Sequence, residues 1–90
     1  MTKPPAEFLR ATKRLGARVA TLRREHGLTQ DQLAAITGIS RNQIQNIENN
    51  RNNSRDPKTG KFGVANPGLE TIFRLAKALD VDAVDLIGKG

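Results

Sequence analysis

Cysteine, tryptophan and tyrosine are absent from this 90-residue sequence, and only three phenylalanines and one histidine are present. The absence of cysteine excludes disulfide bonds and thiolate metal sites, and it suits a reducing cytoplasm. Few aromatic rings argue against stacking on unpaired bases, so duplex nucleic acid is favoured over single strands. No apolar run approaches the ~20 residues that cross a bilayer, and "MTKPPAEF" lacks the apolar stretch of a signal peptide. We therefore expect a soluble cytoplasmic protein without a membrane partner.

Basic side chains are in excess. The sequence has 15 lysines and arginines against 9 aspartates and glutamates, a formal net charge of +6. This excess favours a polyanionic partner, with nucleic acid first and an anionic membrane surface second. It lies in residues 1–68, which hold 12 basic and 5 acidic side chains, whereas residues 69–90 hold 3 and 4. The length allows one small core, so residues 1–90 are interpreted as a single domain.

The N-terminal third predicts one amphipathic helix after a flexible arm at residues 1–7. Phe8, Leu15, Val19 and Leu22 recur at helical spacing. Gly16 inside this stripe costs about 1 kcal/mol relative to alanine. The start of the regular helix could therefore lie as late as residue 12. Gly27 predicts a left-handed cap at its end, with residue 28 packing back on the last turn.

Two capping-box spacings predict two further helices close together. Thr29 stands three residues before Gln32, and Ser40 three residues before Gln43. Each hydroxyl can therefore accept from the backbone amide of the glutamine, and the glutamine side chain can accept from the backbone amide of the cap residue. The apolar side of the first of these helices would consist of Leu33, Ala34 and Ile36. Gly38 and Ile39 would form the turn.

Residues 51–68 are rich in glycine and proline, have little apolar periodicity and carry a local charge of +3, so we expect a long basic loop. Within it, "DPKTGKF" could turn a small hairpin. Asn66 and Pro67 predict the start of a fourth helix. Its apolar stripe would be Leu69, Ile72, Phe73, Ala76 and Leu79. Asp82 can cap a last short helix, "AVDLI", so the predicted fold class is all-α, with five helices.

The helix expected at residues 41–49 is unusual because its exposed face carries amides. With Ile44 and Ile47 toward the core, Asn42, Asn46 and Asn49 fall on the opposite side, and Arg41 and Gln45 flank them. Solvated helices usually expose Lys, Glu and Arg instead. Amides match N6 and N7 of adenine, arginine matches O6 and N7 of guanine, and each bidentate pair discriminates by ~1–3 kcal/mol. This face is therefore predicted to read bases.

The stretches "LGARVATLRREHGLTQDQLAAITGISRNQIQNIENN" and "LETIFRLAKALDVDAVDLIG" resemble the helix-turn-helix family of lambda repressor, Cro and the XRE-type regulators. The resemblance covers residues 15–50 and 69–88 and is most specific at "GLTQ", "GIS" and "IENN". It implies a compact lambda-repressor-like domain whose helix-turn-helix is residues 29–49, with a supporting helix at 29–37 and a recognition helix at 41–49 in the major groove.

The resemblance also implies residue roles. It places Arg41, Asn42 and Asn46 at base-reading positions, Gln30 at a phosphate position, Asn49 and Arg51 at the backbone-contacting end, and Arg23 with Glu48 at a structural ion pair. We add Gln45 to the base-reading set, and Ser40, Gln43, Lys58 and Lys61 to the backbone-contacting set. The chain departs from the family at Asn50, where many relatives have glycine, and in the length of the 51–68 loop. That loop could be a wing over a phosphate or the minor groove, or a disordered insertion.

Two functions remain in competition. The first is a sequence-specific regulator of transcription, a repressor that binds operator DNA as a two-fold homodimer with half-sites about 34 Å apart. The second is an antitoxin or adaptor that binds a protein partner, such as a toxin, through its fourth and fifth helices. An enzyme, a metal site and a cofactor are not expected, because no His or carboxylate cluster has the required spacing. His26 is interpreted as a helix-end contact and Phe62 as a small anchor of the loop.

Overall fold

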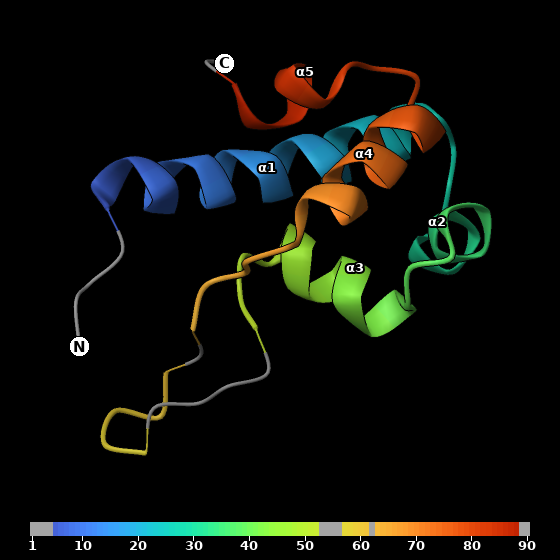
Figure 1. The fold of residues 1–90 in the computed structure, drawn as a ribbon. Helices are drawn as coiled ribbons and strands as arrows, with labels where there is room; N and C mark the ends of the chain where they lie inside the picture. The colour runs from blue at the N-terminus through green and yellow to red at the C-terminus, as the bar shows by residue number, and fades with distance from the viewer. Residues whose placement is uncertain (1–4, 53–56, 62, 89–90) are drawn as a thin grey trace.

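The computed structural model describes residues 5–52, 57–61 and 63–88. Within these residues it has five helices and no strand (Figure 1). In chain order the helices are α1 (Ala6–Glu25), α2 (Gln30–Thr37), α3 (Arg41–Glu48), α4 (Leu69–Ala78) and α5 (Ala83–Ile87). The predicted all-α fold with five helices is confirmed. No helix in this described part combines the length and the apolar character needed to cross a membrane.

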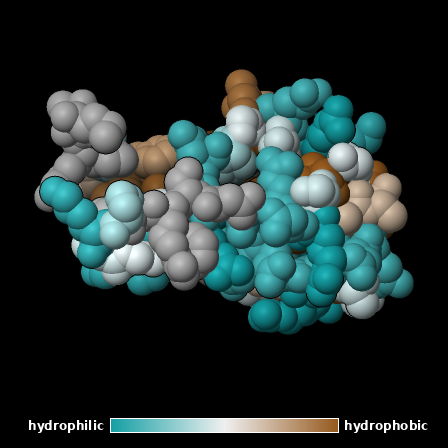
Figure 2. All heavy atoms as spheres, turned by 90° about the horizontal axis from the view of Figure 1, so that it is seen from below, coloured by the Kyte–Doolittle hydropathy of each residue, from teal (hydrophilic) through white to brown (hydrophobic). Residues whose placement is uncertain are grey.

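The long helix α1 lies between α3 and α5. It contacts α3 on one side and α5 on another, while α4 contacts both α2 and α5. In Figure 1, α3 lies below α1 and α5 above it, and the described residues 57–61 lie below α3. The face seen from below is largely hydrophilic (Figure 2). The helix-turn-helix pair thus presents one side to solvent and the other to the core.

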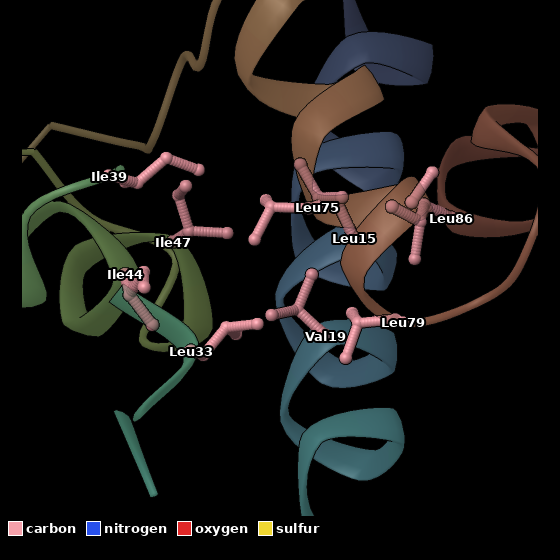
Figure 3. Packing of buried hydrophobic residues seen from close by; sticks show 10 residues of the cluster. Leu15, Val19, Leu33, Ile39, Ile44, Ile47, Leu75, Leu79 and Leu86 are labelled. Atoms are coloured by element: carbon pink, nitrogen blue, oxygen red, sulfur yellow. The ribbon is translucent and has the colours of Figure 1, made fainter. Parts of the chain in front are cut away.

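One hydrophobic core joins all five helices. Its fully or almost fully buried members, shown in Figure 3, are Leu15, Val19, Leu33, Ile39, Ile44, Ile47, Leu75, Leu79 and Leu86. The predicted stripes are wrong at their edges, because Ile36, Leu69 and Phe73 are 59%, 68% and 56% exposed. On α4, Phe73 is about 100° around the helix from Ile72, and the buried face turns toward Leu75 instead. Apolar side chains are therefore left on the surface of α2 and α4.

The first helix begins earlier than expected. Ala6 and Glu7 already belong to α1, so the predicted arm at residues 1–7 is too long, and residues 1–4 lie outside the described residues. The helix begins before Gly16 although glycine is a poor helix former, and α3 crosses α1 at this residue. A Cβ on Gly16 would lie 2.3 Å from the backbone oxygen of Ile47 and 3.1 Å from that of Glu48. The glycine permits this close crossing, and the contact offsets its low helix propensity.

Helix ends follow the local signals in most places. Gly27 has φ +69°, and the amide of Leu28 donates to the carbonyl of Arg23 at 3.0 Å, so the predicted left-handed cap is confirmed. Asn50 adopts the same conformation with φ +52°, although it is not glycine. The capping box at Thr29 is confirmed, with both of its hydrogen bonds formed.

Two predicted caps differ in the structure. Ser40 Oγ accepts from the backbone amide of Gln43 at 3.1 Å, but among the described residues α3 has no return bond from the Gln43 side chain to Ser40. Helix α4 is capped by Gly68, not by Asn66 and Pro67. Before α4, Ala65 is buried, Pro67 lines an apolar pocket together with Phe8 and Ile72, and Gly68 is extended. The fourth helix therefore begins at Leu69.

The 51–68 loop is closed at its base by Asn52. The backbone amide of Asn52 donates to the carbonyl of Gly63 at 2.7 Å, and its side-chain Nδ2 donates to the carbonyl of Val64 at 3.1 Å. Residues 57–59 form a turn and Gly60 has φ +72°, but no strand of the suggested hairpin is formed in the described part of the loop. Residues 53–56 and Phe62, the suggested anchor, lie outside the described residues.

Candidate nucleic-acid interface

The sequence of α3 gives it one buried and one exposed face. Ile44 and Ile47 are 0% and 2% exposed and fix the helix to the core. Arg41, Asn42 and Asn49 are exposed on the remaining surface, while Gln43 and Gln45 are partly exposed. Side chains that can fork onto base edges therefore lie together on one solvent-facing side.

Asn46 does not lie on this exposed face as predicted. It is only 9% exposed, its Nδ2 donates to Asn42 Oδ1 at 3.3 Å, and its Oδ1 accepts from Arg51 Nε at 3.4 Å. The helical wheel places Asn46 away from the core, but Asn52 and Pro67 line the polar hollow beside it. Its place beside the ends of the loop, which no helical periodicity encodes, accounts for the difference.

A buried carboxylate holds the helix-turn-helix against α1. Glu48 accepts from Arg23 twice, at 2.7 Å from Nε and 3.0 Å from Nη2, and from Gln30 Nε2 at 3.1 Å. The Arg23 and Glu48 side chains are only 12% and 5% exposed, so this bidentate pair is largely shielded from water. The hydrogen bond with Glu48, more than its charge, raises the pKa of the Arg23 guanidinium, and burial acts in the opposite direction. Arg23 Nη1 also donates to the carbonyl of Leu28 at 2.8 Å.

This cluster changes the interpretation of Gln30. The residue was assigned to a phosphate by resemblance, and the structure places its amide nitrogen on Glu48. A side-chain amide carries two hydrogens, so the bond to Glu48 orients the group and leaves a second donor direction. Its side chain is partly exposed at the start of α2. The geometry is that of a fixed donor beside α3.

Arg41 is held much less firmly than Arg23. Its Nε lies 3.4 Å from Asp31 Oδ1, and the two side chains are 62% and 75% exposed. Exposed pairs of this kind contribute about 0–1 kcal/mol because water and salt screen them. Arg41 can therefore leave Asp31 for a more favourable anion or base edge at little cost.

The loop places basic groups beyond the end of α3. Lys58 and Lys61 are exposed at and after the turn at residues 57–59. In Figure 1 the described residues 57–61 lie far below the helical body, on the same side of α1 as α3. The loop and α3 thus border the largely hydrophilic lower face in Figure 2. A polyanion along this face could meet both elements.

Several contacts between helices hold the scaffold, and of these the sequence indicated only a helix-end contact of His26. His26 Nε2 lies 3.0 Å from the carbonyl oxygen of Leu79, which links the ends of α1 and α4. Arg74 Nη1 donates to the carbonyl of Thr37 at 3.2 Å, and Arg18 Nη1 donates to the carbonyl of Asp85. Each bond uses a helix-end carbonyl that lacks a partner within its own helix. In the described residues, no group of three or more His, Asp or Glu side chains could hold a metal ion.

Comparison with known proteins gives consistent matches. A family model described as a helix-turn-helix domain matches residues 16–89. The uncharacterized HTH-type transcriptional regulator y4dJ of Sinorhizobium fredii (strain NBRC 101917 / NGR234) is 35% identical over 75 residues, which are 83% of this chain and 80% of that protein. Antitoxin PezA of Streptococcus pneumoniae serotype 4 (strain ATCC BAA-334 / TIGR4) is 31% identical over 75 residues, which span 83% of this chain and only 39% of PezA.

Solved structures share the arrangement of helices. The restriction-modification controller protein C.AhdI from Aeromonas hydrophila superposes with a TM-score of 0.63 and 29% identity, covering 83% of this chain and 94% of that one. The biofilm regulator SinR, solved in complex with DNA, superposes with a TM-score of 0.63 and 24% identity over 80% of this chain and 95% of that one. The likeness to SinR concerns the fold alone.

Proposed function

The chain belongs to the helix-turn-helix family of XRE and lambda-repressor-type transcription regulators, and we propose that it is a sequence-specific repressor. It binds double-stranded operator DNA as a homodimer in the cytoplasm. One observation carries this proposal: α3 exposes Arg41 and Asn42 while Ile44, Ile47 and Glu48 fix its opposite side. A rigid helix with a forked polar face suits the major groove.

The roles divide between base edges and phosphates. Arg41, Asn42 and Gln45 read bases because they lie on the accessible side of α3. Contacts to the DNA backbone come from the ends of the helices and from the loop, namely from Gln30, Ser40, Gln43, Asn49, Arg51, Lys58 and Lys61. Asn46 is reassigned from base reading to the support of its neighbours, since it is almost buried. Such phosphate contacts make affinity fall steeply with salt.

The homodimer is proposed to form through α4 and α5. Leu69 and Phe73 lie one turn apart on α4 and are both more than half exposed, and Val84 on α5 is 65% exposed. Exposed apolar side chains that lie next to each other on a surface can mark a protein contact, and Leu69 and Phe73 form such a pair on α4. Residues 69–90 also lack the net positive charge of the rest of the chain, so two copies would not repel each other there.

The test is selection of bound duplexes from a random library at near-physiological salt. The proposal expects a palindromic motif with half-sites about one helical turn apart. An Arg41→Ala variant should lose preference at one position in each half-site and keep its fold, as judged by circular dichroism. Binding without sequence preference, or no binding, would contradict the proposed repressor function.

A second candidate function is an antitoxin or adaptor that binds a protein through α4 and α5. The match to antitoxin PezA and the exposed Phe73 support it. The test is co-purification with the product of an adjacent reading frame. A one-to-one complex that Phe73→Ser abolishes would support this function, and a homodimer that the adjacent product leaves intact would oppose it.

A further inference from the structure

One side of α1 is left exposed by the other helices and carries much of the positive charge of α1. Gly16 marks the side of α1 that meets α3. Lys13, Arg24 and Arg10 are exposed and lie about 60°, 80° and 120° around the helix from it. The buried Leu15 lies about 100° from Gly16 in the opposite direction, toward the core (Figure 3). We call the three exposed basic residues the outer stripe.

The protein itself does not neutralise the outer stripe. No ion pair among the described residues includes a member of the stripe. The carboxylates of α1, Glu7 and Glu25, are exposed near its two ends. Arg14 is partly buried next to the stripe, about 160° from the α3 side, and its Nε has no hydrogen-bond partner within the described residues. The positive charge on this side is therefore available to an anionic partner.

The residues between the cations indicate which kind of anion fits. Ala17 and Thr21 lie on the same side of α1 and are exposed, so the stripe holds small side chains and no large apolar one. A helix that lies on a membrane needs large apolar residues on the side it buries, and the core of a protein interface usually contains aromatic or apolar anchors. An interface with duplex DNA is polar and strongly positive. The chemistry of the outer stripe therefore fits DNA phosphates best.

We propose that the outer stripe of α1 binds the phosphate backbone of a second DNA duplex while α3 reads the first. This inference rests on the proposed function as a DNA-binding protein. The stripe is turned by about a quarter of a revolution from the side on which α3 lies. One straight duplex in contact with α3 does not run along it. DNA resists bending over lengths below its persistence length of about 150 bp, whereas a second duplex reaches the stripe without bending.

The dimensions of the stripe suit a duplex. Arg10 and Arg24 are 14 positions apart in one helix, which is about 21 Å along its axis. The major groove is about 12 Å wide, so cations at the two ends of the stripe can meet phosphates on both of its walls. The proposed homodimer contact uses α4 and α5, which leaves the stripe accessible in the dimer.

A capture experiment tests this second contact. Operator duplex fixed to beads is saturated with protein, and a fluorescent duplex that lacks the operator motif is then added. The unmodified chain should hold the second duplex on the beads. A variant with Arg10→Gln, Lys13→Gln and Arg24→Gln should lower this capture by at least about tenfold, because up to three phosphate contacts are lost. Its affinity for the operator alone should stay within about twofold, since α3 is untouched. Thermal melting checks that the variant is folded.

A matched pair of single variants separates position from net charge. Arg24 and Lys77 are both exposed in the last turn of a helix, α1 and α4 respectively. Arg24→Glu and Lys77→Glu change the net charge equally and place the same residue in the same helical context. Arg24→Glu should lower capture by at least about threefold, and Lys77→Glu should leave it unchanged. Equal losses in the two variants would show that overall charge acts and that the stripe is not the site.

The remaining outcomes distinguish the inference from the proposed function. Capture that the triple variant loses while it keeps operator affinity supports the second contact. A chain that binds the operator but captures no second duplex overturns the inference and leaves DNA recognition standing. If long flanks on one operator raise its affinity and the triple variant abolishes this gain, the stripe binds the same duplex and the assignment to a second one is wrong. Vesicles rich in phosphatidylserine that displace only the second duplex would assign the stripe to a membrane. A chain that binds no duplex at all refutes both proposals.

Discussion

Replacing Gly16 by alanine sets two physical effects of opposite sign against each other. Alanine is the better helix former by about 1 kcal/mol, so local propensity alone predicts stabilisation. The new Cβ would lie 2.3 Å from the Ile47 carbonyl oxygen, which belongs to the backbone and not to a flexible side chain. Helix α3 would have to move away from α1 by several tenths of an ångström or more. Overpacking of this kind typically costs 1–3 kcal/mol, and occasionally more.

The contacts around Gly16 favour the upper part of that range. Glu48, whose carbonyl lies 3.1 Å from the same Cβ, carries the carboxylate that binds Arg23. A shift of α3 would therefore stretch a buried bidentate pair as well as the apolar contacts of Ile47. We expect a net destabilisation of about 2 kcal/mol, which lowers Tm by roughly 8–16 °C for a domain of this size. Affinity for the proposed operator should fall with it, because the same shift displaces α3, the proposed recognition helix.

Chemical denaturation and thermal melting measure this effect directly. Thr21→Ala is the matched control, since Thr21 is exposed on the same helix. It should stabilise by about 0.5 kcal/mol through propensity alone. If Gly16→Ala stabilises the protein like the control, the crossing is not as close as the structure has it and the packing argument is refuted.

Three other perturbations test separate parts of the molecule. Glu48→Ala should cost about 3–5 kcal/mol, because it leaves Arg23 buried without its partner, and a loss below 1 kcal/mol in urea unfolding would contradict this. Lys58→Ala with Lys61→Ala should weaken binding to all duplexes equally and reduce the slope of log affinity against log salt by about 2, whereas an unchanged slope would place the loop away from DNA. If the proposed homodimer forms, Phe73→Ser should shift it toward monomer in sedimentation equilibrium with little change in Tm, and an unaltered dimer would show that the interface lies elsewhere.

The helix boundaries could be predicted wherever a short-range signal decided them. Thr29, Gly27 and Asp82 act through bonds to residues within a few positions, so their sequence neighbours were sufficient. The start of α1 could not be predicted in the same way. Gly16 weakens the local helix, and its compensation comes from α3, about 30 residues later in the chain. Helix propensity describes only the first of these effects.

The candidate site shows the same limit. A helical wheel correctly separated Ile44 and Ile47 from the polar residues, because that division depends only on spacing. It could not reveal that Asn46 would be almost buried beside the ends of a long loop. Nor could it show that Leu69 and Phe73 would remain exposed, since the choice of buried face on α4 depends on α2 and α5. Errors occur where a second element decides the environment.

The two arginine pairs near α3 differ in a way that suits recognition. Arg23 and Glu48 are shielded, bidentate and joined by Gln30, so they fix the backbone of the helix-turn-helix. Arg41 and Asp31 are exposed and 3.4 Å apart, so their separation costs little. The helix is therefore held firmly by Glu48, while Arg41 stays free to move to a base in its proposed role. A shielded Arg41 would slow recognition, and an exposed Glu48 would hold the helix less firmly.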